Sequence, residues 1–184
     1  MKRKIGAVVI ALGLIVTFYV LSTYLSISEK ENLVYTLWAD VERTSFEKVH
    51  AINDIIIATE KLPHNDDKLV ELKEKLAENI KCIISANELT DENIAKFINS
   101  QETVNIALHD YMDGESWYAS QGIKTKRETV NRFNNRLFVE IEAYSNSAKD
   151  FNAYISRTRH RYVARLGSFQ PKFFVKSSND TVAE

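Results

Sequence analysis

The sequence is poor in residues that break helices or bend the chain. It holds five glycines and two prolines among 184 residues, so we expect few loops and long secondary-structure elements. The single cysteine, Cys82, excludes an internal disulfide and a cysteine-based zinc site. Isoleucines surround it, which predicts a packed, unreactive thiol. No glycine-rich phosphate loop, Gly-x-Ser-x-Gly or His-Glu-x-x-His motif occurs, so the sequence lacks these signatures of nucleotide binding, serine hydrolysis and zinc proteolysis.

Charge is absent from residues 5–28, a run of 24 positions that follows the basic residues 2–4. As a helix this run is about 36 Å long, enough to cross a hydrocarbon core of about 30 Å. The alternative, a cleaved signal peptide, has a shorter apolar region and a small-residue cleavage site. No alanine stands near the end of the run. We therefore predict a basic flank over 1–4 and an uncleaved transmembrane signal anchor over 5–28. The anchor residues are Ile5, Val9, Leu14, Phe18, Leu21 and Leu25.

The flanks of the anchor predict its orientation. Three basic residues precede it, whereas the stretch after it is mixed and slightly acidic. Basic residues are retained on the cytoplasmic side. The expected arrangement is a single-pass protein of the bacterial inner membrane, with a cytoplasmic N-terminus and an extracytoplasmic body.

The body, residues 29–176, has the period of helices and no useful alternation of period two, which predicts an all-α fold. The first helix continues from the anchor to Leu62, before Pro63. A second helix begins at Asn65 or Asp66, and a third is capped by Thr90. Short connections favour antiparallel neighbours, so we expect an up-and-down bundle of about four long helices. The apolar stripe of the first helix after the anchor comprises Val34, Trp38, Val41, Val49, Ile52 and Ile56, with Ser45 between Val41 and Val49.

The fourth helix has the most regular apolar pattern. Thr125 and Glu128 fit a capping box at its start, and Gly167 and Pro171 mark its end. A flexible tail is predicted over 177–184. The steps of three and four resemble the a/d seam of a coiled coil. The seam residues are Val130, Phe133, Leu137, Ile141, Tyr144, Ala148, Phe151 and Ile155.

The ionisable residues form no catalytic or metal-binding pattern. The four histidines lie on different predicted elements. His109 and Asp113 stand one turn apart, but a third ligand would have to come from elsewhere, and a solvated polar face explains the pair better. We therefore predict no enzymatic activity, no metal and no cofactor.

Charge is divided unevenly along the body. Residues 29–118 carry a net charge of −10 and residues 119–184 carry +6. Internal pairing of the basic last helix with acidic earlier helices is the first interpretation. The second is a surface that contacts anionic lipid headgroups or an acidic partner; nucleic acid is not expected outside the cytoplasm. The residues of this candidate anionic-contact surface are Arg157, Arg159, Arg161, Arg165 and Lys172.

Several short segments resemble the LemA family of bacterial membrane-anchored helical proteins. The matching segments are Leu37-Trp38-Ala39-Asp40-Val41-Glu42, Asn134-Asn135-Arg136-Leu137, Tyr144-Ser145, Asp150-Phe151-Asn152-Ala153-Tyr154-Ile155 and Leu166-Gly167-Ser168-Phe169-Gln170-Pro171-Lys172-Phe173-Phe174. The resemblance implies an all-helical membrane protein without an agreed activity. Some relatives are associated with bacterial organelle membranes, which suggests membrane organisation.

The chain departs from the family pattern in two places. Residues 47–56 lack the proline and arginine pair of the corresponding family segment, and residues 117–124 replace its Tyr-Pro-x-Leu-Lys-like loop. The chain is thus similar to a divergent member, and the matched residues are explained by helix packing.

The functional hypothesis is a membrane-anchored scaffold or assembly protein of the bacterial envelope. Its expected partners are the lipid bilayer and other proteins, or a second copy of the chain through an exposed helical seam. The alternative is an envelope ligand-binding or sensory module with a cavity between helices.

Overall fold

The computed structural model describes residues 2–60, 62, 66–113, 117 and 120–175, with side chains described from Ile10 onward. Within these residues the structure is helical and contains no strand, which confirms the all-α prediction. The elements are α1 (Lys2–Thr59), α2 (Asp66–Ser85), the short 3-10 helix η1 (Ala86–Glu88), α3 (Asp91–Met112), α4 (Gln121–Ser156) and α5 (Thr158–Leu166). The predicted tail, 177–184, lies outside the described residues.

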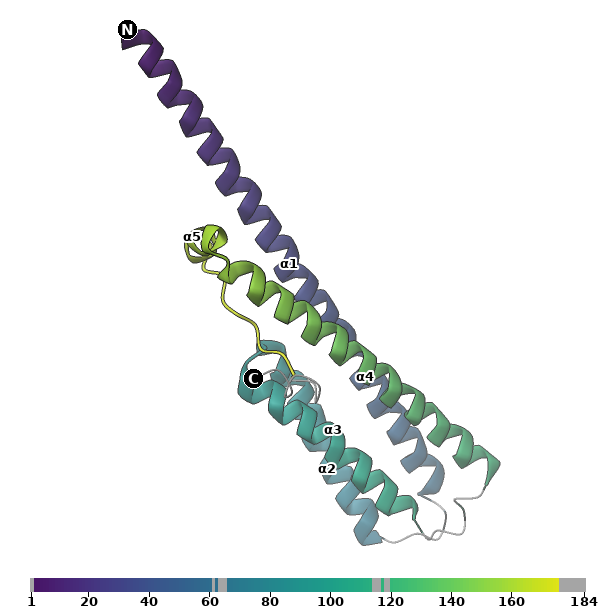
Figure 1. Cartoon of the computed structure of the whole chain (residues 1–184). Coiled ribbons are helices and arrows are strands. Elements are labelled where there is room, and N and C mark those ends of the chain that lie inside the picture. The colour runs from purple at the N-terminus through teal and green to yellow at the C-terminus, as the bar shows by residue number, and fades with distance from the viewer. Residues whose placement is uncertain (1, 61, 63–65, 114–116, 118–119, 176–184) are drawn as a thin grey trace, which may run out of the picture.

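The helices form two pairs that differ in length. α1 packs along α4, and α2 packs along α3, as Figure 1 shows. Successive long helices run in alternate directions, and the N-terminal half of α1 extends beyond the other helices. α1 has 58 residues and α4 has 36, whereas α2 and α3 have 20 and 22. The end of the bundle from which the N-terminal half of α1 projects therefore consists of α1, the end of α4 and α5.

The stripe predicted along α1 forms part of the core. Trp38 is its largest member and is 4% exposed. Its ring centroid lies 5.4 Å from that of Phe97 on α3 and 4.9 Å from that of Tyr144 on α4. Edge-on contacts of this kind stabilise aromatic pairs beyond the burial of area. The indole Nε1 donates to Asn87 Oδ1 at 3.3 Å. Trp38 thus joins three helices and the α2–α3 connection.

Predicted boundaries of the first and the last long helix differ from the structure. α1 ends at Thr59, three residues before the predicted end at Leu62. α4 begins at Gln121, with Ser120 as the N-cap, four residues before the predicted capping box. Thr125 lies inside the helix, where its hydroxyl donates to the Gln121 carbonyl oxygen at 3.0 Å, so the capping-box prediction was wrong. By contrast, the predicted cap of α3 is confirmed, because the Thr90 side chain accepts from the Asn93 amide at 3.3 Å.

The predicted last helix is interrupted between α4 and α5. Arg157 adopts an extended conformation (ψ 135°) between α4 and α5. Figure 1 shows α5 nearly end-on, whereas α1 and α4 are seen from the side, so α5 turns across α1 instead of continuing α4. The break changes the direction of four arginines that the sequence places on one continuous helix.

Candidate functional site

The apolar N-terminal part of α1 is long enough to cross a membrane. It belongs to the one such helix among the described residues, with a mean hydropathy of 2.0 over its most apolar window. Of the predicted anchor residues, Leu14, Phe18, Leu21 and Leu25 are exposed on the helix surface. The side chains of Ile5 and Val9 lie outside the described set. An exposed apolar helix of this length is typical of a segment that lies in lipid.

The C-terminal part of the chain packs against the last turns of the predicted span. Tyr19 donates its hydroxyl to the Arg159 carbonyl oxygen at 3.3 Å, and the rings of Tyr24 and Phe169 lie 5.3 Å apart. On the same stretch of α1, Thr23 and Ile27 are buried. One face of the segment 19–28 therefore contacts protein, whereas residues 10–18 are exposed on every side of the helix.

α5 has one buried face and two exposed ones. His160, Val163 and Ala164 form the buried face. The His160 ring stacks near Tyr154, with centroids 4.2 Å apart, and its Nδ1 lies 3.1 Å from the Tyr154 carbonyl oxygen. The same carbonyl oxygen accepts from the Arg157 amide at 3.4 Å, at the end of α4. These contacts hold α5 at an angle to α4 without a glycine or a proline.

Four exposed arginines gather around α5, and we call them the arginine surface: Arg157, Arg159, Arg161 and Arg165. None of them has a carboxylate partner among the residues that the structure describes. Arg157 lies over the Tyr154 ring, 5.5 Å from its centroid. Arg161 donates to the Ser156 carbonyl oxygen at 3.3 Å. The four positive charges are thus not neutralised by the acidic helices, in contrast to the internal-pairing interpretation.

Lys172, which the sequence groups with these arginines, is engaged inside the molecule. Its ammonium group lies 2.6 Å from Glu31 Oε1 and donates to the Tyr35 hydroxyl at 2.8 Å. Burial opposes its protonation, but the hydrogen bonds that it donates to Glu31 and Tyr35 outweigh that effect and raise the Lys172 pKa. For Lys172 the internal-pairing interpretation applies, and we leave it out of the arginine surface.

The segment 167–175 runs back along α4 in an extended conformation. Asn152 holds it twice: Nδ2 donates to the Lys172 carbonyl oxygen at 2.6 Å, and Oδ1 accepts from the Lys172 amide at 2.8 Å. Tyr144 donates to the Phe173 carbonyl oxygen at 2.7 Å, and burial raises the Tyr144 pKa. Phe169, Phe173 and Phe174 pack against the core. A cavity of about 430 Å³ remains between α4, α5 and this segment. Its volume is within the range of roughly 300–1,000 Å³ that small-ligand pockets have.

A polar layer lies inside the bundle, which sequence reasoning missed. Lys48 is 1% exposed, and its Nζ donates to Gln101 Oε1 at 2.9 Å. Nearby in the sequence of α3, Ser100 accepts from Asn79 Nδ2 of α2 at 2.8 Å. Burial lowers the Lys48 pKa to about 8. The signal for this layer was the position of Lys48 on the stripe that joins Val41 and Ile52 in steps of three and four.

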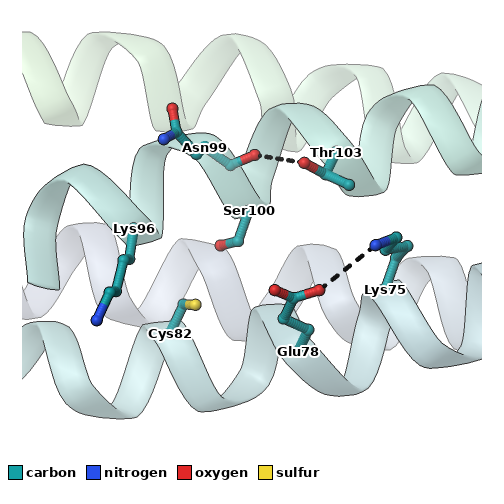
Figure 2. A pocket seen from close by; sticks show the side chains of 7 residues that line it. All are labelled: Lys75, Glu78, Cys82, Lys96, Asn99, Ser100 and Thr103. Atoms are coloured by element: carbon teal, nitrogen blue, oxygen red, sulfur yellow. Dashed lines mark hydrogen bonds and ion pairs between the residues drawn. The ribbon is translucent and has the colours of Figure 1, made fainter.

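A groove of 300 Å³ lies between α2 and α3. Figure 2 shows Cys82 and Ser100 directed between the two helices, with Lys75 and Glu78 at the rim. Lys75 pairs with Glu78 at 3.6 Å, and Lys96 pairs with Glu92 at 2.5 Å. Cys82 is half-buried and packs against the core. The groove offers mixed polar and apolar contacts, but its lysines already have carboxylate partners.

His109, which the sequence analysis considered as a metal ligand, is exposed, and its Nδ1 lies 3.6 Å from Asp110 Oδ1. Across the described ranges, no three His, Cys, Asp or Glu side chains are placed to hold a metal ion. A comparison with protein-family models, curated proteins and solved structures finds no match to this chain.

Proposed function

We propose that the protein is a membrane-anchored helical scaffold or assembly protein of the bacterial envelope. The observation that carries the proposal is the continuity of α1, which runs without a break from Lys2 to Thr59. The same helix supplies the apolar N-terminal segment and the core residues that contact α3 and α4. A rigid helix that leaves the bilayer and becomes part of a bundle fixes the distance and direction of the bundle's surfaces from the membrane.

The remaining parts of the proposal follow from the sequence. The basic flank favours a cytoplasmic N-terminus, which places the up-and-down bundle on the outer side of the inner membrane. The motifs of α1 and α4 favour a divergent relationship to the LemA family. We assign no catalytic residue, metal or cofactor, and we expect the protein to act through contacts with proteins and lipid.

The bundle offers an apolar contact on its outer surface. Phe138 and Val139 are neighbours on α4 and are 71% and 61% exposed. Adjacent large apolar side chains that face water favour a protein contact. Because α4 lies directly on the continuous α1, a partner at this position would be held at a constant height above the bilayer.

Photo-crosslinking in living cells tests the scaffold. A photoreactive phenylalanine analogue replaces Phe138, and a matched chain carries it at Glu74, an exposed polar position on α2. We expect Phe138 to give discrete crosslinked products in the membrane fraction, with a second copy of the chain or an envelope protein, and Glu74 to give none. Equal crosslinking at both positions, or none at either, would argue against a scaffold that uses this face.

The groove between α2 and α3 supports the alternative function, a ligand-binding or sensory module. A ligand at a hundred times its Kd stabilises a protein by about 2.7 kcal/mol. A small molecule that raises the melting temperature, and loses this effect when Ser100 is replaced with leucine to fill the groove, would favour the sensor. A scaffold predicts no such ligand.

A further inference from the structure

The exposed surface of α5 divides into two faces. Arg161 and Arg165 lie on the face that lines the 430 Å³ cavity, together with Asn152 and Pro171 from the bundle side. Steps of three and four place Arg159, Tyr162 and Leu166 on the other exposed face. Tyr162 and Leu166 are 70% and 80% exposed, so this second face is directed away from the bundle. Apart from Arg159, it is apolar.

This second face lies at the level where α1 leaves the bundle. The start of α5 contacts Tyr19, whereas the segment that follows α5 contacts Tyr24, more than one turn nearer the bundle. α5 also crosses α1 and does not run along it (Figure 1). If α1 stands upright in a bilayer, the axis of α5 is therefore roughly parallel to the membrane surface.

The length of α1 places that level at the bilayer boundary. Residues 5–24 span about 30 Å as a helix, the thickness of a hydrocarbon core. With the basic residues 2–4 held at the opposite surface, Tyr24 lies at the edge of the hydrocarbon, and Tyr19, which bonds to the start of α5, lies about 8 Å inside it. That depth is within the roughly 5–10 Å to which the apolar face of an interfacial helix is buried. Tyrosines such as Tyr19 and Tyr24 are enriched at that depth, where a ring meets lipid and a hydroxyl meets water.

We infer that α5 is an interfacial helix that binds the outer surface of the membrane crossed by α1, with anionic lipid headgroups as its partner. The inference rests on the proposed membrane anchor. Tyr162 and Leu166 enter the boundary between headgroups and acyl chains, as the apolar face of an interfacial helix does. The arginine surface, which has no carboxylate partner among the described residues, contacts lipid phosphates. Arginine suits this role because its guanidinium binds phosphate oxygens through two hydrogen bonds.

The contact would give the protein a second attachment to the bilayer. A single helix leaves a bundle free to tilt and to rotate about the helix axis. α5, however, packs against α1 and α4 and buries His160, Val163 and Ala164. Binding of α5 to headgroups therefore holds one side of the bundle towards the membrane. Phe138 and Val139 on α4 then face a defined direction.

The depth of α5 can be measured with the full chain in lipid nanodiscs. In a Cys82→Ser background, Leu166→Cys or Tyr162→Cys carries an environment-sensitive fluorophore, and lipids with a spin label near the headgroup quench it. Val139→Cys on α4 is the matched control, because it is exposed but lies far along α4 from α5. We expect about threefold or more quenching at 166 and 162 relative to 139, since only α5 lies within reach of the headgroups.

Two failures are distinguishable in this experiment. A chain that does not float with lipid in a density gradient lacks the anchor, and the proposed function fails. A chain that floats but is quenched equally weakly at 166, 162 and 139 keeps the anchor, and the interfacial position of α5 is overturned.

The lipid charge is tested by varying the nanodisc composition. We expect quenching at 166 to increase when phosphatidylglycerol replaces part of the phosphatidylcholine, and the increase to vanish in Arg159→Gln/Arg161→Gln/Arg165→Gln. The control variant Lys124→Gln/Lys126→Gln/Arg132→Gln, at the other end of α4, should retain it. The proposed partner is wrong if the triple arginine variant keeps the increase. It is also wrong if added inorganic phosphate abolishes it at constant ionic strength, because the arginines would then bind free phosphate.

Discussion

Replacing Trp38 with alanine is expected to lower the free energy of unfolding by about 3–5 kcal/mol, the range for truncating a buried aromatic side chain. Trp38 is almost fully buried between α1, α3 and α4, where it contacts the rings of Phe97 and Tyr144. The substitution removes both ring contacts and the hydrogen bond to Asn87, and it leaves a cavity where three helices meet. Urea unfolding of the full chain in nanodiscs, followed by circular dichroism, measures the change.

Leu33→Ala is the matched control for this prediction. Leu33 lies on the same helix but is 52% exposed, so we expect a change of about 0.5 kcal/mol or less. Trp38→Phe should fall between the two, because it keeps an aromatic ring but loses the indole donor. If Trp38→Ala unfolds at the same urea concentration as the unmodified chain, Trp38 does not join these helices in solution.

The stability of the bundle is expected to rise with pH through the titration of Lys48. The Lys48 pKa is about 8 in the folded protein and 10.5 in the reference state. Below pH 8 the buried ammonium is charged, and its desolvation costs about 3 kcal/mol in full. Between pH 8 and 10.5 the unfolded chain binds more protons than the folded one, so stability increases with pH. From pH 7 to pH 10 we expect a gain of about 2 kcal/mol from this group.

The Lys48→Met variant isolates this contribution, because every other titrating group is common to both chains. The difference in unfolding free energy between the two proteins should change by about 2 kcal/mol over the same pH range. A hydrogen bond from Lys48 to Gln101 is lost in the variant, but that loss shifts the difference uniformly. A difference that stays constant from pH 7 to pH 10 would show that Lys48 is not desolvated.

Apolar periodicity predicted the buried faces of the long helices well. On α1 it identified the buried residues Val34, Trp38, Val41, Val49, Ile52 and Ile56. Helices bury a stripe of side chains at steps of three and four, and few glycines or prolines interrupt that pattern here. The burial of Lys48 was not predicted, because a charged side chain is expected at the surface. Its position on the stripe, however, is a core position.

The break at Arg157 was not predictable from local sequence. Arginine is a good helix former, and neither glycine nor proline stands nearby. The break depends on two contacts of α5: the His160 ring packs on Tyr154, and the Tyr19 hydroxyl donates to the Arg159 carbonyl oxygen. The false capping box has a similar cause, since Thr125 and Glu128 also fit the interior of a helix that begins earlier at Gln121.

The candidate anionic-contact surface was predicted in composition but not in geometry. Charge counting places Lys172 with the four arginines, because all five lie in a segment without carboxylates. The structure separates them: segment 167–175 folds back along α4 and brings Lys172 to Glu31, whereas α5 directs the arginines outward. A pairing between residues so far apart in the chain leaves no periodic signal.

We propose that α1 anchors the bundle on the outer side of the inner membrane. Protease protection of a C-terminal tag tests this position directly. The tag is digested either in cells whose inner membrane is intact but whose outer face is accessible, or after the inner membrane is permeabilised. We expect protease to remove the tag from the membrane-bound chain while the inner membrane is still intact. Protection until that membrane is breached would place the bundle in the cytoplasm, and a tagged chain found free of the membrane would contradict the anchor itself.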